Sequence, residues 1–250
     1  MLMGPAKSGK SMAMVTFAMK AAQAGYNVLY VSLEVSKNII ADRMEAALSG
    51  IKINDLSVHM KKAHDMTVIA EAKAGHLKVH DYASGTFTPN QLRRLLRRYE
   101  AMGIKFDMVV LDYADLMAPD KVSNEPRENS RMIYVNLRGV AHEFNLALLT
   151  ATQANRAGFK AATGDMEHVS DDINKVRTVD LMISSTATKQ IRTMVKPDFT
   201  LQPRVTSSLR RSRSRQILDQ VVTSNRLFRW WHDQIQQRSP RQLGHGVRPR

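Results

Sequence analysis

The chain has 250 residues, of which 43% are hydrophobic and 24% charged, a composition that suits one folded domain of moderate size and excludes global disorder. It contains no cysteine, so disulfide scaffolds, thiolate metal sites and cysteine nucleophiles are excluded. No apolar run approaches the ~20 residues that cross a bilayer, and Lys7 and Lys10 interrupt any signal-peptide core, so we expect a cytoplasmic protein without a membrane partner.

The net charge of +14 is unevenly distributed along the chain. Residues 189–250 contain 14 of the 37 Lys and Arg residues but 3 of the 23 Asp and Glu residues, so this quarter carries a charge of +11. The total therefore says little about the surface of residues 1–188. It gives only weak support for a polyanionic partner.

The first 185 residues alternate short β-branched apolar runs with amphipathic stretches, which is typical of an α/β protein with a mainly parallel sheet flanked by helices. A helix is expected over residues 11–24, ending at Gly25. A second helix is expected after Thr88, whose sequence forms a capping box, and it ends near Gly103. The expected strands cover residues 28–32, 77–80, 108–112, 146–150 and 181–184.

Two stretches within this region are expected to be exposed loops, residues 118–129 and residues 155–170. The helix after Thr88 also carries a cluster of arginines largely opposite its leucines, which we interpret as a solvated face. These arginines are Arg93, Arg94, Arg97 and Arg98.

Residues 189–250 differ from the rest of the chain. Helical and strand periodicity fades after about residue 189, and Arg, Ser and Gln become frequent. We therefore expect one domain at residues 1–188 and a basic, low-complexity tail at residues 189–250. We hypothesise that the tail is disordered or translated from a shifted reading frame, which comparison of the three frames of the underlying DNA would test.

The strongest motif lies at the front of the chain. Residues 4–11 satisfy the pattern G-x-x-x-x-G-K-[ST] and lead directly into a helix, so backbone amides and the helix N-terminus can face one phosphate chain. Lys10 would place a cation against the β- and γ-phosphate oxygens, and Ser11 would ligate Mg²⁺. The alternative is an accidental glycine–lysine turn. The predicted nucleotide-binding residues are Gly4, Pro5, Ala6, Lys7, Ser8, Gly9, Lys10 and Ser11.

Three polar residues follow or end apolar runs and are candidates for the remaining chemistry. Asp112 ends the run 108–112, at the edge of an open α/β sheet where ligands bind, and is the predicted second residue of the Mg²⁺ site. Glu34 and Gln153 occupy comparable places, suited to orienting an attacking water and sensing a γ-phosphate. On position alone, both residues are equally compatible with ordinary surface sites at strand ends.

Three segments, in order and spacing, resemble replicative helicases of the DnaB type. They are Ser32-Leu33-Glu34-Val35-Ser36, Asp112-Tyr113-Ala114-Asp115-Leu116-Met117 and Gln153-Ala154-Asn155-Arg156. The resemblance covers residues 1 to about 185. It implies a RecA-like P-loop ATPase core that binds ATP and Mg²⁺, assembles into a ring, expected to be a hexamer, and moves on single-stranded DNA. A primase or a loader is the further partner that it implies.

The same resemblance assigns roles to individual residues. By this likeness Glu34 is the catalytic carboxylate, Gln153 the γ-phosphate sensor, and Asp112 the acid associated with Mg²⁺. Arg156 and Lys160, in the loop after Gln153, correspond to DNA contacts.

The chain departs from the family at two points. Only three residues precede the P-loop where the family has a full strand. We therefore expect a truncated first strand, so that the sheet lacks the strand that should support the loop, and we expect terminal strands to be missing. No arginine-finger segment is evident near the other end. Two alternatives therefore stay open: a KaiC- or RadA-type ATPase of recombination or signalling, which usually has two acids where this chain has Glu34-Val35, and an inactive nucleotide-binding remnant.

Overall fold

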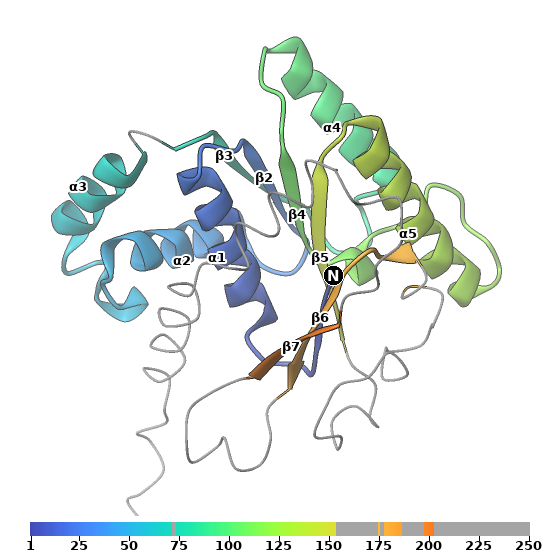
Figure 1. Ribbon diagram of the computed structural model, residues 1–250, viewed down its shortest axis with the longest axis horizontal. Helices are drawn as coiled ribbons and strands as arrows, with labels where there is room; N and C mark the ends of the chain where they lie inside the picture. The colour runs from blue at the N-terminus through green and yellow to red at the C-terminus, as the bar shows by residue number, and fades with distance from the viewer. Residues whose placement is uncertain (72–73, 154–174, 176–177, 187–197, 203–250) are drawn as a thin grey trace, which may run out of the picture.

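The computed structural model of the chain describes residues 1–71, 74–153, 175, 178–186 and 198–202. Within them, seven strands form one sheet in the order β3-β2-β4-β5-β1-β6-β7. Neighbouring strands are parallel except β6 and β7, which are antiparallel. A mainly parallel sheet flanked by helices is therefore confirmed (Figure 1).

The elements agree closely with the apolar runs of the sequence. The strands are β1 Leu2–Gly4, β2 Val28–Ser32, β3 Leu77–Asp81, β4 Met108–Asp112, β5 Ala147–Gln153, β6 Met182–Thr186 and β7 Asp198–Gln202. The helices are α1 Lys10–Gln23, α2 Lys37–Ser49, α3 Met60–Glu71, α4 Pro89–Ala101 and α5 Pro126–Glu143, with 3₁₀ turns η1 Ile53–Asp55 and η2 Ala114–Leu116.

Two apolar cores cover the two faces of the sheet. Alternate side chains of β2 and β4 point to opposite faces, so Leu29 and Val109 pack with α4 and α5, whereas Tyr30 and Val110 pack with α1 and α2. Figure 1 shows the same division, with α4 and α5 on one side of the sheet and α1, α2 and α3 on the other. Burial on both faces explains why these strands are continuous apolar runs rather than alternating ones.

The strand before the P-loop is present, although it is only three residues long. β1 lies in the interior of the sheet, where Leu2 is opposite Ala151 of β5 and Ile183 of β6. All three of its residues are buried. The expectation that the sheet lacks this strand is therefore wrong, because pairing on both sides satisfies the backbone of even a very short strand.

Other differences concern helix starts and the end of the sheet. α5 begins at Pro126, inside the stretch expected to be a loop, because proline at the first helical position starts this helix rather than marking a turn. β7 lies at Asp198–Gln202, within the range assigned to the tail, and pairs with β6. The expected loop 155–170 lies outside the described residues, and the domain boundary at residue 188 stays a prediction.

The arginine cluster of α4 is partly engaged with the neighbouring helix rather than simply solvated. Arg93 Nε and Arg97 Nη2 donate to the two carboxylate oxygens of Glu143 on α5, at 2.7 and 2.8 Å. These hydrogen bonds are the main reason that the pKa of Glu143 lies below its usual value. The cluster thus helps to fix α5 against α4.

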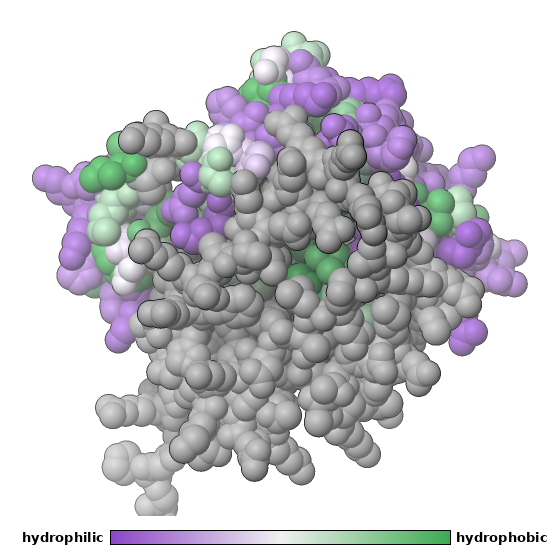
Figure 2. All heavy atoms as spheres, viewed as in Figure 1, coloured by the Kyte–Doolittle hydropathy of each residue, from purple (hydrophilic) through white to green (hydrophobic). Residues whose placement is uncertain are grey.

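The surface over these helices is hydrophilic, whereas that over α3 is mixed. Figure 2 shows mainly hydrophilic residues over α4 and α5. In the region of α3 it shows hydrophobic and hydrophilic residues side by side. The exposed hydrophobic residues of that region include Val58, Met60, Val68 and Ile69. Among the helices of the described ranges, none combines the length and apolar character that a membrane crossing needs.

Thr88→Ala is expected to lower the free energy of unfolding by about 1 kcal/mol, because it removes the N-cap of α4. The Thr88 hydroxyl accepts from the backbone N–H of Gln91 at 3.2 Å, and the Gln91 side chain accepts from the backbone N–H of Thr88. Ser36→Ala is the matched control, since Ser36 is the N-cap of α2 but makes no side-chain cap hydrogen bond. Urea unfolding followed by circular dichroism measures both variants, and equal losses would contradict the assignment.

Candidate nucleotide-binding site

The loop between β1 and α1 has the backbone that a phosphate-binding loop requires. Gly9 is the N-cap of α1 with φ of 86°, and Lys7 also has a positive φ, of 61°. A left-handed backbone favours glycine at the first of these positions, because a side chain there is strained. The turn brings the loop amides and the first turn of α1 to one side of the sheet, where they can face an anion.

Lys10 folds back over this loop. Its Nζ donates to the carbonyl oxygens of Gly4, at 2.9 Å, and Pro5, at 2.8 Å. Burial lowers the pKa of Lys10, whereas the carboxylates of Glu34 and Asp112 act in the opposite direction. The ammonium group is therefore partly desolvated and lies in a negative field, ready to neutralise an anion.

The two predicted metal-binding residues lie in direct contact. Ser11 Oγ donates to Asp112 Oδ1 at 3.2 Å, across 101 positions of the chain. Asp112 is almost fully buried, and burial raises its pKa, while hydrogen bonds from Tyr30 and Ser11 act to lower it. A hydroxyl and a carboxylate placed together are oxygen ligands of the kind that hard divalent cations prefer.

Tyr30 supports this carboxylate and was not found from the sequence. Its hydroxyl is buried and donates to Asp112 Oδ2 at 3.0 Å. The parallel register explains the contact, because Tyr30 of β2 lies two residues before Ser32, which is paired with Asp112. The only signal in the sequence is a hydroxyl in the middle of a mainly apolar strand.

Glu34 and Gln153 reach the same edge of the sheet. Glu34 is exposed and lies two residues beyond β2. Its negative charge opposes the lowering of the Lys10 pKa by burial and adds to the raising of the Asp112 pKa by burial. Gln153 ends β5, is paired with Gly4 of β1, and donates from Nε2 to the Tyr113 hydroxyl at 3.1 Å. The structure thus brings both residues to the P-loop, at the carboxyl ends of parallel strands where ligands of such sheets bind.

A third acidic group, missed by the sequence analysis, lies next to these residues. Asp115 of η2 accepts hydrogen bonds from the Tyr134 hydroxyl, the Thr152 hydroxyl and the Lys175 ammonium group, at 2.7, 2.8 and 2.9 Å. Its charge also raises the pKa of Lys10 against the effect of burial. Asp115 lies within the segment 112–117 that resembles the helicase family, but that resemblance gave it no role of its own.

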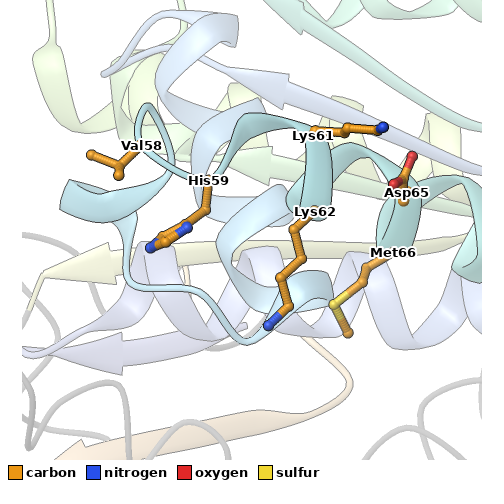
Figure 3. A pocket seen from close by; sticks show the side chains of 6 residues that line it. All are labelled: Val58, His59, Lys61, Lys62, Asp65 and Met66. Atoms are coloured by element: carbon orange, nitrogen blue, oxygen red, sulfur yellow. The ribbon is translucent and has the colours of Figure 1, made fainter.

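The remaining features are two predicted positions and one pocket. Arg156 and Lys160, the predicted DNA contacts, lie outside the described residues. A separate open pocket lies before and along α3 and contains none of the predicted site residues (Figure 3). It is lined by Val58, His59, Lys61, Lys62, Asp65 and Met66.

The fold is that of the RecA-like ATPase domain of DnaB-type helicases. A solved structure described as an ATPase domain matches with a TM-score of 0.67 and 14% identity, over 80% of this chain and 74% of that one. A DnaB-like replicative helicase, solved in a study of its interactions with primase, matches with a TM-score of 0.66 and 13% identity, over 82% of this chain and 54% of that one.

The family profile for the DnaB-like helicase C-terminal domain matches residues 1–171, and the chain belongs to this family. It is 23% identical to the DnaB-like replicative helicase of Enterobacteria phage T4 over 199 residues, which cover 76% of this chain and 42% of the relative. It is 25% identical to the replicative DNA helicase DnaB of Helicobacter pylori over 152 residues, which cover 60% and 31%. The chain thus spans less than half of either relative, and the comparisons favour the DnaB type over the KaiC or RadA type.

Tyr30→Phe is expected to lower the free energy of unfolding at neutral pH by about 2 kcal/mol, because a buried carboxylate loses a hydrogen bond. This bond lowers the pKa of Asp112, so its contribution is present when Asp112 is ionised. The difference in unfolding free energy between the wild type and Tyr30→Phe should therefore become smaller as the pH falls through the folded-state pKa of Asp112. Urea unfolding at a series of pH values measures it.

Tyr99→Phe is the matched control. Its hydroxyl contacts the ring Nε2 of His80 at 2.7 Å, in a partly exposed place. Because burial lowers the pKa of His80, this partner is uncharged at neutral pH, and the loss should be smaller. An equal loss for the two variants would contradict the importance of the Asp112 charge.

Proposed function

We propose that this chain is the ATP-hydrolysing motor domain of a DnaB-like replicative helicase, which couples hydrolysis to movement along single-stranded DNA. The observation that carries the proposal is the 3.2 Å contact between Ser11 and Asp112, beside the ammonium group of Lys10. This contact joins the phosphate-binding loop, which ends at Ser11, to the metal-binding acid at the end of β4, and a P-loop ATPase needs both. Membership of the family supplies the reaction class.

The loop residues suit the binding of ATP. Ser8 Oγ is buried and has no hydrogen-bond partner among the described residues, and a phosphate oxygen would satisfy it. The Lys10 ammonium group would exchange the carbonyl oxygens of Gly4 and Pro5 for phosphate oxygens. The backbone amides of residues 6–11 would donate to the same phosphates.

The donor set also fits Mg²⁺, held by the Ser11 hydroxyl and, directly or through water, by the Asp112 carboxylate. Bound there, Mg²⁺ would neutralise charge that develops on the phosphate oxygens. Tyr30 keeps the Asp112 carboxylate in place through its hydrogen bond to Oδ2. Burial raises the pKa of Asp112, so a cation would relieve an existing cost of ionisation.

Glu34 and Gln153 would act on the reacting groups. The exposed Glu34 carboxylate is suited to orient the attacking water and accept its proton. The Gln153 amide, which donates to Tyr113 here, would instead donate to a γ-phosphate oxygen and so report whether the phosphate is present.

The proposal extends to the partners of the motor. Single-stranded DNA would be the polymer that it moves along, with Arg156 and Lys160 among its contacts. The subunits would assemble into a ring, a hexamer, and a primase or a loader would be a further partner, as the description of one matched helicase suggests. The setting would be the cytoplasm of a bacterial or phage-infected cell, with the ATPase core at residues 1–188 and a tail at residues 189–250.

Lys10→Ala is expected to abolish the binding of Mg-ATP, because it removes the cation from the phosphate site. In a thermal unfolding assay, ATP at about 100 times its Kd stabilises the folded wild-type chain by about 2.7 kcal/mol, and this stabilisation should be lost in the variant. Lys7→Ala is the control from the same loop: residue 7 would bind through its backbone amide, which the substitution keeps, and its side chain is exposed, so the variant should keep most of the shift. Absence of a shift in the wild-type chain would favour an inactive remnant.

Glu34→Gln is expected to retain Mg-ATP binding but to lose hydrolysis, with kcat lowered at least about 100-fold, the range typical for removal of a general base. Phosphate release with and without single-stranded DNA measures it, and DNA should stimulate the wild-type chain. Glu100→Gln, at an exposed position on α4, should hydrolyse ATP like the wild type. Normal turnover in Glu34→Gln would remove Glu34 from the proposed role.

A further inference from the structure

The Asp115 cluster joins three separate parts of the chain through one carboxylate. Tyr134 comes from α5, Thr152 from the end of β5, and Lys175 from the chain beyond residues 154–174. Oδ1 accepts from Tyr134 and Lys175, whereas Oδ2 accepts from Thr152. Both carboxylate oxygens are therefore used.

The cluster is largely desolvated. The Lys175 side chain is only 7% exposed and that of Asp115 19%, and the Lys175 ammonium group lies 5.7 Å from the centre of the Tyr134 ring. A buried ion pair of this kind contributes little net stability, yet removal of one partner leaves an uncompensated buried charge. Its value therefore lies more in fixing positions than in stabilising the fold.

The positions that it fixes belong to the proposed catalytic site. Asp115 follows Asp112 by three residues, and Thr152 immediately precedes Gln153. The Thr152–Asp115 hydrogen bond, at 2.8 Å, thus holds the residue next to the proposed γ-phosphate sensor against the turn that follows the proposed metal-binding acid. Lys175 places a positive charge 2.9 Å from Asp115 Oδ1 and so orients the carboxylate.

Other contacts already hold the surrounding structure together. The Thr150 hydroxyl donates to the carbonyl oxygen of Leu111 and accepts from the backbone N–H of Ala114, at 2.9 Å each, which joins β5 to β4 and η2. Arg138 of α5 also holds the segment before β6, residues 178–181, which we call the returning chain. It donates to Asp180 Oδ1 at 2.8 Å and to the carbonyl oxygen of Thr178 at 3.0 Å. The Asp115 cluster is therefore not required to keep these elements in contact.

We propose that Asp115 and Lys175 are positioning residues for ATP hydrolysis, which act through Thr152 to place Gln153 relative to Asp112. The inference rests on the proposed function of the site. Without the Lys175 ammonium group, the Asp115 carboxylate loses its counter-charge and its orientation toward Thr152. The end of β5 then no longer holds Gln153 in the geometry that hydrolysis needs, whereas the phosphate-binding loop is unchanged.

The test is the effect of Lys175→Met on the steady-state kinetics of ATP hydrolysis by the full chain, with and without single-stranded DNA. We expect kcat to fall about 10-fold, within the range of coupling energies for such networks, while KM for ATP stays within about 2-fold of the wild-type value. Thr152→Val removes only one hydroxyl and should lower kcat about 3-fold with KM unchanged. If Lys175→Met does not fold, the kcat of Thr152→Val tests the inference by itself.

Arg138→Gln is the matched control, because it releases the same returning chain from α5 without touching Asp115. Its kcat and KM should equal those of the wild type, whatever stability it loses in urea unfolding. The inference is overturned if Arg138→Gln lowers kcat as much as Lys175→Met does, or if the kcat of Thr152→Val is that of the wild type. A wild-type chain that hydrolyses no ATP overturns the proposed function and this inference with it, whereas an active wild type with equally active variants overturns this inference alone.

Discussion

Parallel pairing in register is the constraint on which the candidate site depends. β4 lies beside β2 with Asp112 paired to Ser32, and β5 lies beside β1 with Gln153 paired to Gly4. Residues more than a hundred positions apart therefore reach one edge of the sheet through backbone hydrogen bonds alone, before any side chain makes a contact. The Ser11–Asp112 hydrogen bond is a consequence of this arrangement, and a one-residue shift of register would turn Asp112 to the other face of the sheet.

The sequence predicts this architecture well, because strands buried on both faces are continuous apolar runs that are easily recognised. The run 108–112 is a five-residue strand with the bounds expected, and the residues of the P-loop are followed by α1 as the motif requires. The positions of Glu34, Gln153 and Asp112 at one edge could be predicted since parallel strands share a carboxyl end. Their roles in hydrolysis are predictions that rest on the family resemblance.

The parts that could not be predicted depend on long-range pairing rather than local pattern. Three residues before the P-loop are too few to suggest a strand, and β1 forms because β5 and β6 lie on either side of it. Tyr30 and Asp115 gain their importance from partners 82 and 60 positions away, Asp112 and Lys175, which no local pattern could indicate. The start of α5 at Pro126 was missed for a different reason, since proline marks both turns and helix starts.

The Lys10 side chain has a further consequence for the kinetics of nucleotide exchange. Its ammonium group already donates to the carbonyl oxygens of Gly4 and Pro5. These oxygens would therefore compete with phosphate oxygens for the Lys10 ammonium group. In the proposed ATPase, nucleotide entry would replace these two contacts by contacts to phosphate oxygens, and the lost contacts would moderate the affinity. In the proposed ATPase, the same exchange would ease product release, because the lysine would regain its carbonyl partners as the phosphate leaves.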